Sequence, residues 1–220
     1  MGILANSKNK MIKSLLIRSF IKLYKPAIEE ALVSDVSKYP TYNSFFIRQL
    51  KKEARPIETS ELIVVSPVDG TIIDHGHLKN NMLLQAKKHS YSVKELLGEE
   101  EKIDRSQSYF ITIYLAPTDY HRIHCPFDGY IESTMHLGKS LFSVNKKAQS
   151  NIPLLYIKNE RALIKVKNEL LSYSLVSVGA SIVGSIVPFW TNKKSKSRKD
   201  YIREWDVGPE ENMKRVLKGQ

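Results

Sequence analysis

The strongest constraint on the fold is a series of short β-prone runs after Pro56. Residues with high strand propensity recur in runs bounded by turn residues, namely Leu62–Val65, Thr71–Ile73, Met82–Gln85, Tyr109–Leu115, Tyr130–Met135, Ala162–Val166 and Leu171–Val178. Between them only Ser92–Leu97 reads as a helix, with Ser92 placed to cap it. Many short strands without alternating long helices predict an α+β fold, mainly antiparallel β and of barrel or sandwich type.

The N-terminal region has a different pattern. No acidic residue occurs between Met1 and Ile28, whereas this stretch contains six lysines and arginines. Its apolar residues recur at helical spacing until Pro26, at Ile12, Leu16, Phe20 and Leu23, with Leu15 alongside. This pattern is typical of an amphipathic helix that lies on an anionic lipid surface. The alternative is an ordinary amphipathic helix that packs on its own domain.

A domain boundary is expected in the connector from Ser34 to Pro40, because Pro40 biases the preceding residue away from helix. We therefore predict a basic amphipathic helical segment over residues 1–33 and one β-rich domain over residues 34–220. A short helix should open that domain over Thr41–Leu50, with Thr41 as its cap and an apolar face that includes Phe45 and Phe46.

Composition narrows the choice of partners. The chain has 34 basic and 23 acidic residues and a net charge of +11, which favours an anionic partner. Nucleic acid is the weaker choice because the aromatic residues do not cluster with the basic runs, and the run at 192–199 reads as a solvated loop. No apolar run is long enough to span a bilayer, so any membrane association is expected to be peripheral.

The chemistry concentrates in His121-Arg-Ile-His124-Cys125, for which three readings compete. A metal site could use both histidines, Cys125 and His136, but a strand would place the two histidines on opposite faces and no second ligand cluster follows. A cysteine nucleophile lacks any feature that marks a low-pKa thiolate, and Cys125 also reads as a small buried residue.

The third reading is proton transfer by the histidines, whose ordinary pKa lies near working pH. An acid that could orient one imidazole, Asp69, lies upstream in the turn Ser66-Pro-Val-Asp-Gly70. We assign no metal ligands.

Six segments, in one order along nearly the whole chain, resemble bacterial phosphatidylserine decarboxylases, which are pyruvoyl-dependent. They are Tyr42–Arg48 with Arg55–Ile57, Ser66–Gly70, Tyr114–His124, Leu141–Asn145, Asn159–Arg161 and Val178–Ile186. The resemblance implies conversion of phosphatidylserine to phosphatidylethanolamine and CO2 through a pyruvoyl Schiff base.

The resemblance also implies roles for individual residues. Asp69 matches the orienting acid and His124 the histidine that activates the serine from which the pyruvoyl group forms. His121 matches the histidine that reprotonates the product carbon. Tyr114 and Ser143 match positions that line the headgroup pocket, although Ser143 reads equally well as a turn serine that bonds its own backbone.

The family's processed Gly-Ser pair, within an L-G-S-T-like motif, follows a segment similar to Val216–Gln220, and Gly184-Ser185 matches a dipeptide away from that point. We therefore expect most of a β subunit, inactive unless an α subunit carrying the pyruvoyl group is supplied. The expected partners are phosphatidylserine, an anionic phospholipid membrane at its cytoplasmic face, and a second copy in a homodimer, with no nucleic acid. The alternative is a non-catalytic remnant that binds an anionic membrane surface.

Overall fold

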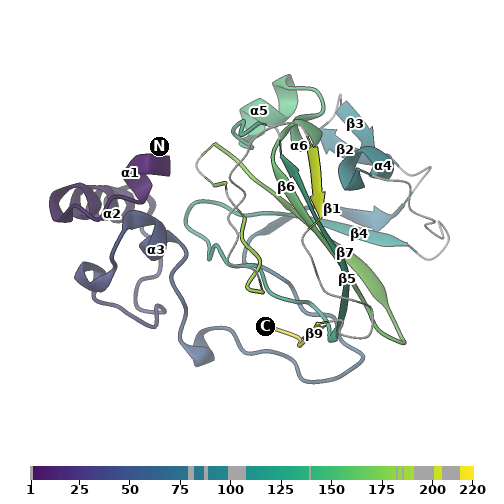
Figure 1. Cartoon of the computed structure of the whole chain (residues 1–220), viewed down its shortest axis with the longest axis horizontal. Coiled ribbons are helices and arrows are strands. Elements are labelled where there is room, and N and C mark those ends of the chain that lie inside the picture. Colours follow the sequence, from purple (N-terminus) through teal and green to yellow (C-terminus); the bar gives the residue numbers. More distant parts are fainter. Residues whose placement is uncertain are drawn as a thin grey trace. The chain divides into compact units, whose positions relative to one another are not determined.

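A computed structural model of the chain describes residues 2–78, 82–86, 89–98, 108–138, 140–181, 183–184, 186–190, 201–204 and 214–220 (Figure 1). The helices are α1 (Gly2–Ala5), α2 (Lys10–Tyr24), α3 (Tyr42–Phe46), α4 (Val93–Leu97), α5 (Lys146–Asn151) and α6 (Leu155–Lys158), with 3-10 turns at Val36–Lys38 and Lys52–Ala54. The strands are β1 (Thr71–His77), β2 (Met82–Ala86), β3 (His89–Ser92), β4 (Tyr109–Tyr114), β5 (Gly129–Gly138), β6 (Arg161–Lys167), β7 (Ser172–Val178), β8 (Tyr201–Glu204) and β9 (Arg215–Val216).

The chain forms two compact units. The first comprises residues 1–73, 112–128 and 217–220, and the second comprises residues 74–111 and 129–216. Strand β1 pairs with β4 in a two-stranded sheet, and the pairings with a defined register elsewhere are antiparallel. The predicted α+β class with mainly antiparallel sheet is therefore confirmed. The division after residue 33 stays a prediction.

The second unit is built on a five-stranded sheet in the order β7-β6-β5-β8, with β9 also paired to β5. On the central pair, Met135 of β5 lies opposite Leu163 of β6, which in turn lies opposite Val176 of β7. These side chains pack with the β2–β3 hairpin, α4 and α6 in one core of buried residues, namely Leu83, Tyr91, Val93, Leu97, Met135, Leu155, Tyr156 and Leu163. The sheet thereby provides a rigid base for the loops at its ends.

The first unit contains an aromatic cluster between α2 and α3. The Asn9 side chain caps α2, and a capping box between Thr41 and Ser44 opens α3. The buried Phe20 ring lies 5.7 Å from the Phe46 ring and contacts the Tyr42 and Phe45 rings at similar distances. The Phe20 side chain of α2 therefore packs on α3 of the same chain, as the second interpretation of this helix expects for that residue.

The other element predictions have mixed outcomes. Six of the seven predicted strands are present, and helix α4 has the predicted Ser92 cap, completed by Glu95. The strand predicted over Leu62–Val65 is wrong, because this exposed stretch makes only isolated backbone bonds such as Val65 N–H to Pro126 O (3.0 Å). Helix α3 is shorter than predicted, since Leu50 leaves the helix to form a bridge with Ala31.

Several elements were not predicted from the sequence, namely α5, α6, β3, β8 and β9. The basic run 192–199 and Ser185 lie outside the described residues. No helix in the part of the chain that the structure describes is long and apolar enough to cross a membrane.

Candidate active site

An arginine holds the Asp69 carboxylate. The Arg55 guanidinium donates from Nε to both carboxylate oxygens (2.9 and 3.1 Å) and from Nη2 to Oδ2 (2.6 Å). The same Nη2 donates to Glu30 Oε2 at 2.9 Å. These bonds from Arg55, followed by its charge and a backbone N–H bond from Tyr120, hold the pKa of Asp69 below its ordinary value despite partial burial. Asp69 is therefore a fixed negative charge at neutral pH.

The turn that carries Asp69 requires a glycine after it. Gly70 has φ +149°, and a Cβ placed there would lie 2.6 Å from the backbone oxygen of Tyr114. This close approach joins the start of β1 to the end of β4, where Tyr114 precedes the loop with the two histidines. Gly70 therefore sets the distance between the Asp69 turn and the histidine loop.

His124 is held between that turn and the C-terminal residues. Its backbone N–H donates to Pro67 O (2.8 Å), and its ring stacks near Tyr120. Its Nδ1 lies 2.9 Å from the carbonyl oxygen of Gly219. A carbonyl oxygen only accepts, so Nδ1 carries the proton and Nε2 of the neutral ring is left as a proton acceptor.

The C-terminal residues run beside this histidine as a short backbone ladder. Cys125 N–H donates to Gln220 O (2.9 Å), and Gly219 N–H donates to Cys125 O (2.8 Å). The Lys218 N–H donates to the Asp128 carboxylate (2.7 Å). Residues far apart in sequence thus place the end of the described chain next to His124.

His121 is also bonded through Nδ1 to a backbone carbonyl, and its ring is more buried. Its Nδ1 lies 2.8 Å from Asp119 O, so Nδ1 again carries the proton, and its ring lies 4.2 Å from the Phe46 ring. Burial lowers the pKa of His121, and the charge of Arg48 acts in the same direction, against opposing contributions from Asp119. His121 is therefore neutral at pH 7, and its protonated form gives up the proton readily.

The expected direct bond from Asp69 to a histidine is absent among the described residues. Both Nδ1 atoms are bonded to backbone carbonyls, and Asp69 is bonded to Arg55. The charge of His124 is a minor cause of the lowered pKa of Asp69. The backbone therefore fixes the tautomers here, and the carboxylate supplies a nearby negative potential.

Ser143 belongs to the second unit. Its hydroxyl accepts from Asn145 N–H at 3.4 Å, which is the local turn contact that the sequence allowed. The fully buried Asn159 holds this loop: it accepts from Phe142 N–H and donates to the carbonyls of Phe142 and Gly179, each at 2.9 Å. Asn159 is thus a positioning residue for the Ser143 loop.

The competing chemical readings find less support. The residues from His121 to His124 form a loop, so the argument from strand alternation does not apply. Within the described ranges, no three His, Cys, Asp or Glu side chains are grouped so as to hold a metal ion. Cys125 is half-buried, and its backbone pairs with Gly219 and Gln220.

Sequence reasoning missed Arg55 and Gly219. Arg55 lies in the quoted segment Arg55-Pro-Ile57, and its long-range pairing with Asp69 left no local periodic signal. Two imidazoles with fixed tautomers and an arginine-held carboxylate are groups that can transfer protons.

Comparison with known proteins identifies the family of this site. Residues 42–220 match the phosphatidylserine decarboxylase family. The phosphatidylserine decarboxylase proenzyme of Vibrio parahaemolyticus is 38% identical over 219 residues, which cover 99% of this chain and 77% of that protein. The proenzyme of Francisella philomiragia is 39% identical over 92% of this chain and 72% of its own length. The chain therefore belongs to the phosphatidylserine decarboxylase family.

Proposed function

We propose that this chain carries the proton-transfer residues of a phosphatidylserine decarboxylase, a carboxy-lyase that converts phosphatidylserine to phosphatidylethanolamine and CO2. The observation that carries the proposal is the pair of imidazoles, His121 and His124, each with Nδ1 bonded to a backbone carbonyl and Nε2 left to exchange a proton. Relatives named proenzymes, which this chain matches over 77% of their length, support the same activity.

The residues present fit a pyruvoyl cofactor. When bound, such a group supplies a carbonyl that takes up the substrate amine and the electrons left behind as CO2 departs. His124 Nδ1 is bonded to Gly219 O, which leaves Nε2 as the acceptor, and Gln220 pairs with the neighbouring Cys125. We propose that His124 is the base for a serine segment joined after Gln220. We propose that this segment belongs to an α subunit, and that Tyr114 and Ser143 contact the headgroup.

The two histidines differ in the proton step they suit. His124 suits the acceptor role, because its Nδ1–H is bonded to Gly219 O and Nε2 is the remaining ring acceptor. His121 suits donation to carbon, since burial lowers its pKa and makes its protonated form a stronger acid. Asp69 remains ionised throughout because Arg55 holds it.

The experiment joins an α-subunit segment with an L-G-S-T-like motif after Gln220 and follows both cleavage and CO2 release. His124→Ala and Asp69→Asn should block self-cleavage, whereas His121→Ala should still be cleaved but decarboxylate about 100-fold more slowly. His89→Ala, in the second unit, is the matched control and should behave like the parent. A His121→Ala protein that stays uncut on a gel would show that the two roles are reversed.

We further propose that α2 binds the cytoplasmic face of an anionic membrane, and that the enzyme acts as a homodimer. Three apolar side chains of α2 are exposed, Met11 (82%), Leu15 (69%) and Leu23 (72%), close in sequence to Arg18 and Lys22. Changing all three to serine should abolish the liposome binding that persists at high salt. Phe20→Ser should instead lower thermal stability, because Phe20 packs on α3. Equal lipid binding by the triple variant and the parent would exclude α2 as the membrane-binding segment. For the homodimer, sedimentation at twice the mass of one chain is expected, and sedimentation as a monomer would contradict the proposal.

A further inference from the structure

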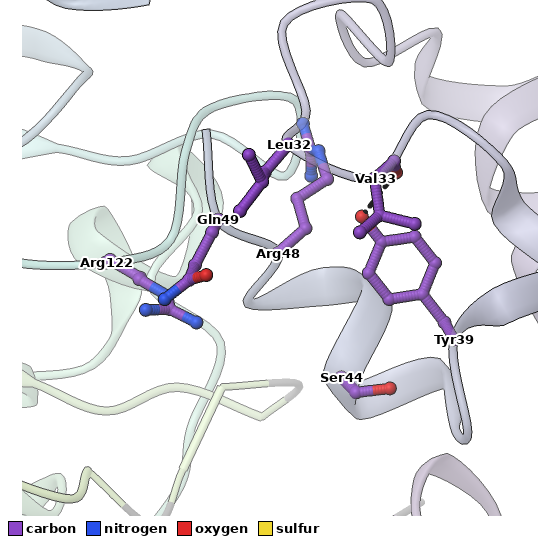
Figure 2. A pocket seen from close by; sticks show the side chains of 7 residues that line it. All are labelled: Leu32, Val33, Tyr39, Ser44, Arg48, Gln49 and Arg122. Atoms are coloured by element: carbon purple, nitrogen blue, oxygen red, sulfur yellow. Dashed lines mark hydrogen bonds between the residues drawn. The ribbon is translucent and has the colours of Figure 1, made fainter. Parts of the chain in front are cut away.

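The first unit contains a small pocket whose walls include two arginines, Arg48 and Arg122 (Figure 2). It encloses about 180 Å³, which is enough for one tetrahedral anion. The other polar groups at its wall come from Tyr39, Ser44 and Gln49, and no acidic residue lines it. In Figure 2 the Arg48 side chain extends between Leu32 and Val33, and Arg122 lies beside Gln49.

Arg48 is a buried cation with an unsatisfied donor. The residue is 4% exposed, and its Nε has no hydrogen-bond partner within the part of the chain that the structure describes. Its guanidinium lies over the Phe45 ring at 5.6 Å, a contact that favours the positive charge but accepts no hydrogen bond from Nε. A buried donor left unpaired costs about 1–3 kcal/mol, so this geometry points to an acceptor that completes the site.

The nearby acids do not supply that acceptor. Glu30 and Asp69 attract Arg48 at a distance, but both carboxylates hydrogen-bond to Arg55. Burial lowers the pKa of Arg48 in spite of these charges. Among the described residues, neither of these carboxylates therefore hydrogen-bonds to Arg48.

Arg122 lines the same pocket as Arg48. Its Nε donates to Ile47 O at 2.8 Å, which fixes the guanidinium at the pocket wall. The two Nη groups are then available to an acceptor in the pocket, and guanidinium N–H groups match the spacing of phosphate oxygens. Arg122 follows His121 in sequence, and the charge of Arg48 contributes to the lowered pKa of His121, so an anion bound here would sit near that histidine.

We propose that Arg48 and Arg122 bind a phosphate-type oxyanion in this pocket. The chemistry is shared by two sources, the phosphodiester of the phosphatidylserine headgroup and free phosphate. Only the headgroup source rests on the proposed function. In that case the two arginines would anchor the substrate phosphate while its serine moiety extends toward His121.

Binding is measured by titration calorimetry of inorganic phosphate into the 220-residue chain, with sodium chloride of equal ionic strength as the reference. Saturable binding is expected, weakened at least tenfold in Arg122→Gln and in Arg48→Gln. Arg215→Gln removes the same charge from an exposed position in the second unit and should bind as the parent does. Because Arg48 is buried, circular dichroism must first show that its variant folds; if it does not, Arg122→Gln alone decides.

Glycerophosphoserine and free serine then separate the sources. Displacement of phosphate by glycerophosphoserine but not by serine identifies the headgroup, and no displacement by either identifies free phosphate. Equal displacement by serine would overturn the proposal, because the site would then recognise a carboxylate. It would also fail if phosphate bound no better than chloride, or if Arg122→Gln bound phosphate within twofold of the parent. This assay needs no cofactor, so its failure is distinct from a failure of decarboxylation.

Discussion

Replacing Asn159 with alanine should destabilise the second unit by about 3 kcal/mol. Asn159 is fully buried, and its side-chain amide makes three hydrogen bonds to backbone groups of the Ser143 loop and the turn at Gly179. Alanine removes all three hydrogen bonds, leaves the three backbone groups without this partner, and creates a small cavity. The prediction tests whether this side chain, rather than local turn propensity, holds the loop in place.

The magnitude follows from which groups are left unpaired. The Asn159 bond to Gly179 O is buried, so its loss costs the full desolvation penalty of about 1–3 kcal/mol. The two bonds to Phe142 are part-buried, so water can replace part of each, at about 0.5–1 kcal/mol apiece. The sum is about 2–5 kcal/mol, which corresponds to a fall in Tm of about 6–12 °C at the central value for a chain of this size.

Urea unfolding of the parent, Asn159→Ala and Asn168→Ala measures the effect. Asn168 accepts from the N–H groups of Leu170 and Leu171 in an exposed turn, so its replacement should cost less than about 1 kcal/mol. Asn159→Asp keeps the acceptor but sets a carboxylate against two carbonyl oxygens, so it should destabilise at least as much as alanine. Hydrogen exchange at the Phe142 N–H should be faster in Asn159→Ala, which removes its acceptor.

Two outcomes would refute this reasoning. If Asn159→Ala and Asn168→Ala lost similar stability, burial would not set the cost of the missing bonds. If Asn159→Asp were as stable as the parent, the two donated bonds would contribute nothing.

Three further predictions concern the first unit. Arg55→Gln should let the pKa of Asp69 rise toward its ordinary value of about 4. A lowered carboxylate pKa stabilises the folded state only above that ordinary value, so urea titrations should show the largest loss of stability relative to the parent at pH 7 and a smaller loss below pH 4. The lowered pKa of buried His121 makes the folded state bind fewer protons than the unfolded state, so the parent should lose stability as the pH falls from about 6.5 to about 5. His121→Asn should lose less stability over this range, and a pH profile equal to that of the parent would contradict the burial of His121. Gly70→Ala should cost about 3 kcal/mol or more by thermal unfolding, because its Cβ would meet Tyr114 O at 2.6 Å, and a near-neutral result would mean that β1 and β4 can separate freely.

Local patterns predicted much of the fold because they act over a few residues. Strand runs such as Ala162–Val166 show strong β propensity, and the caps at Thr41 and Ser92 satisfy helix N–H groups within three residues. The same locality explains the errors. Leu62–Val65 has strand propensity but finds no partner strand, and Leu50 ends its helix early to pair with Ala31.

The sequence by itself determined the mainly antiparallel class and the family, and it singled out Asp69, His121 and His124, because these depend on residue types in a fixed order. Only the tertiary structure decided which groups touch those side chains. Arg55 bonds Asp69 across 14 residues of sequence, and Gly219 bonds His124 across 95 residues. Arg48 and Arg122 line one pocket. Such contacts depend on the path of the whole chain, and no local periodicity records that path.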